Sequence, residues 1–280
     1  MVASHMNDLQ EISTPSFRAL PGLSRVGVIA VNTFRESVRD RVLYNLALFV
    51  LILVGGSIFI SELSVSQEAK FIATLGLSSM LIFGALIAIF IGVGLVYKEI
   101  DRRTIYNLLS KPVHRHEFII GKYFGLCLTL LVNSLVMLLA IELALLYVNR
   151  GFTPVQWPVL AAGLLIYLEL TVLVAIALLF SSFSTPMLAA LFTFALYVIG
   201  HFSADLKLTA SLSQSFVVRA LLSAAYYLLP NLRIFNFITA ASHGDLVDVA
   251  RAIWALAYAV IYVGILLSAT VLIFQRRNFK

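Results

Sequence analysis

The stretch KEIDRRTIYNLLSKPVHRHEFIIGK, residues 98–122, lies between two long apolar runs and decides how the rest of the chain is arranged. It carries six of the twenty Lys and Arg residues, and Pro112 separates two halves of helical composition. A basic loop between two membrane helices stays on the cytoplasmic side. We therefore expect a cytoplasmic helix–proline–helix hairpin, a rigid projection suited to the grip of a soluble partner.

The composition is that of a membrane protein. Hydrophobic residues make up 61% of the 280, charged residues only 12%, and the mean hydropathy is +0.97. A soluble domain would have to expose most of this apolar surface to water, so the lipid bilayer must be the solvent. Cys127, the single cysteine, lies in an apolar run and is expected to be a small packing residue. The net charge of +6 comes from basic residues distributed as a membrane topology requires, so we expect no nucleic-acid partner.

Six apolar runs are long enough, or nearly so, to cross a hydrocarbon core of about 30 Å, which takes roughly 20 helical residues. They cover residues 42–60, 72–97, 123–147, 158–180, 187–202 and 250–274. The fifth run is short, and we expect the semi-apolar stretch after it to make up the difference. The predicted fold is an all-α membrane protein in which residues 24–280 form a single six-helix domain. Residues 1–23 are expected to be a flexible cytoplasmic N-terminus that starts with a cloning remnant, MVASHM.

The distribution of Lys and Arg predicts the orientation. If the N-terminus is inside, fourteen of the twenty lie on the cytoplasmic side and six on the other. This asymmetry favours both termini in the cytoplasm and a multi-pass protein of the bacterial cytoplasmic membrane.

Two further segments have the apolar periodicity of amphipathic helices. In residues 24–41 one face carries Val26, Ile29, Ala30, Thr33, Phe34 and Val38. We expect this helix to lie in the inner headgroup layer, and the alternative is a cytosolic extension of the first span. In the long outer segment 203–249 a second stripe runs through Leu212, Phe216, Val217, Ala220, Leu221, Ala224 and Leu228 and ends at Pro230. A seventh span would put Arg219 in hydrocarbon at a cost of about 2.5–3.5 kcal/mol, so an outer-leaflet helix is preferred.

The chain has no GxxxxGK[ST] run and no HExxH motif. The two histidines of His114-Arg-His116-Glu117 point to different helix faces and do not form a metal pair. Four outer residues, His201, Asp205, His243 and Asp245, would suit zinc if they came together, but loop histidines are more often solvated. We expect no metal site, no catalytic residue and no cofactor in this chain.

Polar and small residues inside the spans are the other candidates. Glu142 is near the outer end of its run and would snorkel to the headgroups. Glu169 is close to the middle, where an ionised carboxylate is costly; with Asn133 it is a candidate for a substrate path or a mid-membrane polar contact. Glu169 has either a structural hydrogen bond or a role in a proton or transport step. The stripe Gly84, Ala88, Gly92 permits close helix approach, as tight packing within the subunit or as a sliding surface.

Three segments, NTFRESVRDRVLYNL (residues 32–46), KEIDRRTIYNLLSKPVHRHEFIIGKYFG (98–125) and LLPNLRIFN (228–236), resemble membrane subunits of ABC transporters of the type 2 exporter class. The branch most similar is that of bacterial permeases for multi-copper enzyme maturation. The resemblance implies an elbow helix before the first span, a coupling helix in the first cytoplasmic loop, and short outer helices before the last span. Many relatives have Gly-Thr where this chain has Arg103-Thr104, whereas Gly121-Lys122 matches the family.

The resemblance also implies the partners. Two copies of a P-loop ATPase would bind ATP and Mg, and a second permease copy or a paralogue would complete the membrane part. The residues expected to couple to the ATPase are Glu99, Asp101, Arg102, Arg103, Thr104, Leu108 and Leu109. Their charges suit ion pairs in a groove of the ATPase, and the leucines would anchor the helix.

Two other functions compete with an exporter permease. One is a membrane-embedded enzyme that acts on lipid, with Glu169, His201 and Asp205 as acid–base groups. The other is a non-transporting subunit that transmits ATPase strokes to an outer-side partner. The sequence has no paired-carboxylate or lipid-transferase motif, which disfavours the enzyme. It favours no substrate class among lipids, peptides, drugs, ions and sulfur species.

Overall fold

The computed structural model describes residues 22–39, 48–53, 55–56, 68–101, 115–203, 209, 212–213 and 215–276. Its elements, in chain order, are α1 (Gly22–Arg39), α3 (Glu68–Asp101), α5 (Arg115–Asn149), α6 (Gln156–Phe183), α7 (Pro186–His201), α9 (Phe216–Leu228), the 3-10 helix η2 (Leu232–Phe235), α10 (Ile238–Ser242) and α11 (Val249–Arg276). No strand occurs in these ranges. The all-α prediction is confirmed for this part of the chain.

Among the described residues, four helices are long and apolar enough to cross a membrane: α3, α5, α6 and α11. They correspond to four of the six predicted spans. Each extends beyond its predicted apolar run, because a helix continues through the polar headgroup region until a cap or a proline ends it. Helices suit this solvent since they satisfy their backbone hydrogen bonds internally.

The two remaining spans have a different outcome. The fifth corresponds to α7, whose 16 residues measure roughly 24 Å and fall short of a full crossing. Of the first, residues 48–53 and 55–56 are helical, and the rest of the predicted run 42–60 lies outside the described residues. Six complete spans therefore stay a prediction.

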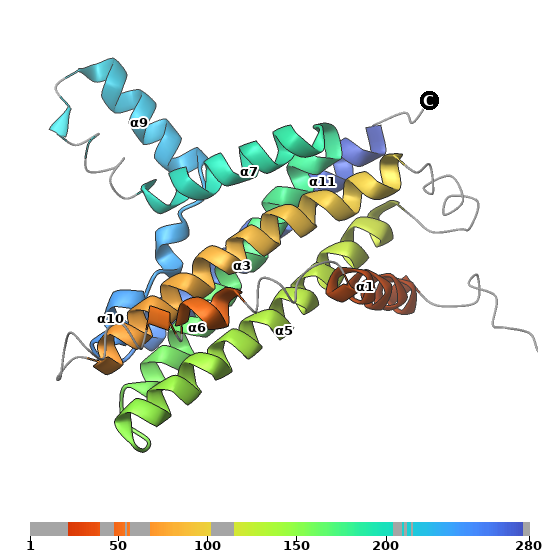
Figure 1. Cartoon of the computed structure of the whole chain (residues 1–280). Helices are drawn as coiled ribbons and strands as arrows, with labels where there is room; N and C mark the ends of the chain where they lie inside the picture. The colour runs from red at the N-terminus through yellow and green to blue at the C-terminus, as the bar shows by residue number, and fades with distance from the viewer. Residues whose placement is uncertain are drawn as a thin grey trace, which may run out of the picture.

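Helix α6 occupies the centre of the bundle. It contacts α3, α5, α7, α10, α11 and η2, and its residues from Leu170 to Leu178 are almost all buried. Figure 1 shows α3 and α5 running alongside it, with α1 and the C-terminus of α11 towards one end and α10 towards the other. We call these the α1 end and the α10 end.

Short connections fix how α5, α6 and α7 are arranged. At the α10 end, Asn149 donates a hydrogen bond to Thr153 Oγ1, and the Thr153 N–H donates to Gln156 Oε1, which closes the turn between α5 and α6. At the α1 end, α6 stops before Thr185-Pro186, because a residue that precedes proline avoids the helical conformation. Pro186 then begins α7, where its missing N–H has no consequence. The three helices therefore alternate in direction.

Helix α1 packs against the first turns of α5. A Cβ atom at Gly125 would lie 2.6 Å from the Ala30 carbonyl oxygen, and one at Gly121 would lie 2.7 Å from Ile29 Cβ. Thr33, on the predicted apolar face, is buried as well. The amphipathic helix predicted for residues 24–41 is present, and part of the face expected to meet the headgroups packs on α5 instead.

The predicted outer helix is α9, which begins at Phe216 and stops short of Pro230. Its 13 residues are too few to span about 30 Å, so α9 by itself is no seventh span. Phe216, Val217 and Arg219 are exposed, and α9 projects away from the bundle (Figure 1). The short elements η2 and α10 lie between it and α11, where short outer helices were expected.

We predict that Gly125→Ala lowers the thermal unfolding temperature of the chain. The added methyl would overlap the α1 backbone, and overpacking of this kind costs about 1–3 kcal/mol. The matched control is Gly264→Ala in α11, where a Cβ meets nothing within 4 Å. Equal unfolding temperatures for the two variants would contradict the close α1–α5 contact.

Candidate functional site

The predicted coupling hairpin joins the ends of α3 and α5 at the α1 end. Glu99 and Asp101 belong to the last turn of α3, where the backbone alone is described. The other predicted coupling residues, Arg102, Arg103, Thr104, Leu108 and Leu109, lie outside the described residues, as does His114. Their role stays a prediction, but the elements that hold the hairpin are visible.

The second half of the hairpin continues directly into α5, and its side chains contact both α1 and α11. We call Arg25, Glu117, Phe118, Lys122 and Phe274 the hairpin base. Arg25 Nη1 lies 3.6 Å from Glu117 Oε2, and the Phe118 ring stacks on Phe274 with centroids 6.1 Å apart. The buried Lys122 places its Nζ 5.2 Å from the centre of the Phe118 ring, a cation–π contact.

The hairpin base links three elements that are far apart in the sequence. Glu117 and Phe118 lie in the first turn of α5, two and three residues after Arg115, where the described part of the hairpin begins. The ion pair joins this turn to α1, and the aromatic stack joins it to the end of α11. The start of α5 is therefore held by two other helices.

The small residues of α3 face α6. A Cβ at Gly84 would lie 2.5 Å from Leu170 Cδ1, and one at Gly92 would lie 3.0 Å from Ala177 Cβ. Ala88, between them, is buried. The alternative that this stripe is a sliding surface is still a prediction, and so is a substrate role for any residue on it.

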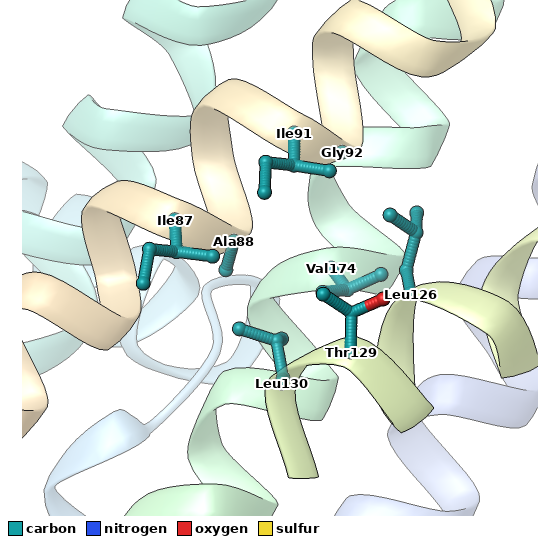
Figure 2. Close-up of a pocket in the computed structure, with 8 residues that line it drawn as sticks. All are labelled: Ile87, Ala88, Ile91, Gly92, Leu126, Thr129, Leu130 and Val174. Carbon is teal, nitrogen blue, oxygen red and sulfur yellow. The ribbon is translucent and has the colours of Figure 1, made fainter. Parts of the chain in front are cut away.

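A small hollow lies between α3, α5 and α6 beside this stripe (Figure 2). Its walls are Ile87, Ala88, Ile91, Gly92, Leu126, Thr129, Leu130 and Val174. The only side-chain oxygen among them, on Thr129, donates its hydrogen to the Gly125 carbonyl. The hollow therefore offers no free polar group to a ligand.

Asn133 lies one turn beyond Thr129 on α5 and is also buried. Its amide nitrogen donates to the Thr129 carbonyl at 2.8 Å, and no partner is found in the described residues for its Oδ1. A carbonyl oxygen without a partner is costly in an apolar bundle. Asn133 therefore remains a candidate for a mid-membrane polar contact.

A second set of polar residues surrounds the C-terminus of α7. Glu169 is fully buried in the middle of α6, and its Oε1 lies 3.3 Å from His201 Nε2. The distance is that of an ion pair, but the alignment is not that of a hydrogen bond. The ring of Tyr197, one turn earlier on α7, contacts the imidazole with centroids 4.7 Å apart.

Hydrogen bonds continue from this pair into the segment before α11. The Ser203 hydroxyl donates to Asn231 Oδ1 at 2.8 Å, and the Asn231 N–H donates to the Tyr258 hydroxyl at 2.8 Å. We call Glu169, Tyr197, His201, Ser203, Asn231 and Tyr258 the polar junction. It satisfies irregular backbone between α7 and α11, which membrane proteins tolerate only where protein covers it.

The four residues considered for zinc do not assemble in the described part of the chain. His201 faces Glu169, while His243 is exposed and its Nδ1 lies 2.7 Å from the Thr239 carbonyl oxygen. Asp245 is exposed, and Asp205 lies outside the described residues. Among the residues whose placement is given, no group of three His, Cys, Asp or Glu side chains could hold a metal ion.

In the described part of the chain, a helical bundle with four helices long and apolar enough to cross a membrane indicates an integral membrane protein. The sequence matches the family described as ABC-2 family transporter protein over residues 28–279. The chain belongs to this family of ABC transporter permeases. A comparison with curated proteins finds no match. The resemblance stated from the sequence is confirmed at the level of the family, and the multi-copper branch stays a prediction.

Sequence reasoning missed two of these contacts although the sequence held a signal for each. Gly121 and Gly125 have the spacing of a GxxxG pair, which marks a close helix contact and here receives α1. Glu169 and His201 are each sixteen residues from Thr185, so a tight α6–α7 hairpin had to place them level with one another.

We predict that Arg25→Glu and Glu117→Arg each lower the unfolding temperature, and that the double exchange restores most of the loss. Each single variant sets like charges together at the α1–α5 contact, and the exchange recreates an ion pair. A double-mutant cycle should give a coupling energy of about 1 kcal/mol. Arg35→Glu, on the exposed face of the same helix, is the control and should change little. Additive effects would show that the pair is not formed.

Proposed function

We propose that this chain is the membrane subunit of an ATP-driven exporter and that its 98–122 hairpin is the coupling element for a separate ATPase. The observation that carries the proposal is the family match over residues 28–279, which includes the hairpin. The chain has no phosphate-binding loop of its own, so the energy source must be bound by another subunit.

The hairpin base supports this proposal. ATPase subunits that close around nucleotide perform work only on something held rigidly, and α5 is held by α1 and α11 directly behind the hairpin. In this proposal α1 is the elbow helix, the α1 end is cytoplasmic, and Arg102 and Arg103 dock in a groove of the ATPase. The lysines and arginines gathered towards that end favour this orientation.

We further propose a dimer of permease subunits with two ATPase subunits. Most of the surface of α11 is exposed in the single chain, as are Phe192, Phe194 and Leu191 of α7. Lipid or a second membrane helix must cover these apolar side chains. The lipid-modifying enzyme and the mechanical subunit have no support of their own in the family match.

We predict that the purified chain alone hydrolyses ATP no faster than a buffer control, and that activity appears when its ATPase subunit is added. The measurement is phosphate release by both samples in the same lipid nanodiscs. Robust turnover by the isolated chain, persisting through a second purification step, would refute the proposed division of labour.

We predict that Arg102→Glu with Arg103→Glu weakens binding of the ATPase at least about tenfold, which corresponds to 1.4 kcal/mol. The reversed charges would meet the groove that the arginines complement. Membrane insertion and unfolding temperature should not change, since the substitutions lie in the loop. The matched control reverses two exposed arginines far from the hairpin, Arg219→Glu with Arg251→Glu. Capture of the ATPase by the loop variant at the control's yield would argue against docking through the hairpin.

A further inference from the structure

The pair formed by Glu169 and His201 is not needed to dock an ATPase, yet it is buried in the middle of the central helix. Glu169 is 0% exposed, whereas the His201 side chain is 20% exposed. A carboxylate at this depth is costly unless it is neutral or paired. The question is how many protons the pair holds.

The contacts of the imidazole indicate how many protons the Glu169–His201 pair holds. His201 Nδ1 lies 3.2 Å from the Tyr197 carbonyl oxygen, and Nε2 lies 3.3 Å from Glu169 Oε1. The carbonyl and an ionised carboxylate are both acceptors, so a ring nitrogen that faces either one without a proton is repelled, even though the Nε2–Oε1 contact has the distance of an ion pair and not the alignment of a hydrogen bond. A neutral imidazole carries one N–H. The arrangement therefore requires one proton more than a neutral histidine beside a carboxylate.

The extra proton is counted in the same way wherever it resides. On the histidine it gives an imidazolium beside a carboxylate, and on the glutamate it gives a carboxylic acid that donates to a neutral imidazole. The pair is neutral overall in both cases. Without the extra proton the pair carries a net negative charge, and whichever ring nitrogen lacks the proton faces an acceptor, either Glu169 Oε1 or the Tyr197 carbonyl oxygen. That state is unfavourable in a low-dielectric interior.

On the described residues of the elements packed around the pair, the titratable and charged side chains include Tyr197 on α7, Tyr258 on α11, Arg233 on η2, Lys70 on α3, Glu142 on α5 and His243 after α10. The tyrosines belong to the polar junction and are neutral near pH 7. Lys70 is in the first turn of α3, and Arg233 and His243 are exposed.

We propose that Glu169 and His201 form a buried proton-binding site that holds the C-terminal end of α7 against α6, and that release of the proton frees this end of α7. The partly exposed face of the imidazole gives the proton a route to the pair. Proton loss leaves a charge that is relieved when the α7 end moves off α6 and admits water. Because α7 leads into the segment between Ser203 and α11, the same step would loosen the polar junction.

The test is thermal unfolding of the full chain in lipid nanodiscs across about pH 5 to 9, the range that covers imidazole and buried carboxyl groups. A proton bound in the folded state stabilises the protein at low pH, and this stability is lost as the pH rises. The wild-type unfolding temperature should therefore fall towards high pH by at least about 3 °C relative to Glu169→Gln. The glutamine amide donates to Nε2 at every pH and needs no added proton.

The matched control is Glu142→Gln, which removes a carboxylate from the second half of α5 and should retain the wild-type fall. A fall of equal size in Glu169→Gln, no fall in the wild type, or loss of the fall in Glu142→Gln would overturn the proposal. The measurement needs no ATPase, so its result is independent of the proposed coupling.

A second measurement does not depend on the folding of Glu169→Gln. In a chain labelled with 15N-histidine, the His201 signals are identified by their absence from His201→Gln. The wild-type Nε2 signal should shift over the same pH range as the unfolding temperature. A His201 signal that stays constant over that range would overturn the proposal. So would a signal that follows the same curve in a folded Glu169→Gln sample.

Discussion

Close contact with α6 is the constraint on which the other helices depend. In hydrocarbon no hydrophobic force drives helices together, so the bundle is held by dispersion contacts that fall off steeply with distance. Gly84 and Gly92 let α3 approach until Leu170 and Ala177 touch its backbone surface. Gly163 does the same for α5, because a Cβ there would overlap Leu138. The glycines set the helix spacing, and the larger side chains fill what remains.

Close packing of the helices also explains where polar groups occur in the bundle. At the α1 end, an ion pair and aromatic rings join α1, α5 and α11 at the hairpin base. In the interior, the pair of Glu169 and His201 lies where α7 stops and irregular backbone begins. A helix that ended there without partners would leave carbonyl groups exposed to an apolar medium. The polar junction supplies those partners, so the short length of α7 and the presence of His201 are parts of one arrangement.

Much of this could be predicted from the sequence because hydropathy reports the solvent directly. The long runs that became α3, α5, α6 and α11 were identified from their length, and the burial of Glu169 followed from its mid-span position. Contacts between helices were harder, since they depend on rotation about each axis. The stripe on α3 was visible, but its meeting with Leu170 on α6 was not. The ion pair from Arg25 to Glu117 was missed because the amphipathic face of α1 has two candidate neighbours, lipid and protein, and hydropathy does not distinguish them.

The contrast between α6 and α11 has a consequence for how the sequence can drift. From Leu170 to Leu178 every side chain of α6 is buried, so selection there acts on shape, and even one methyl group is felt. Most side chains of α11 face the lipid or the partner that surrounds the single chain. Selection on its outward positions acts chiefly on polarity, and Leu, Ile, Val and Phe can replace one another with little effect. Related chains should therefore differ most along α11 while remaining close to this sequence along α6.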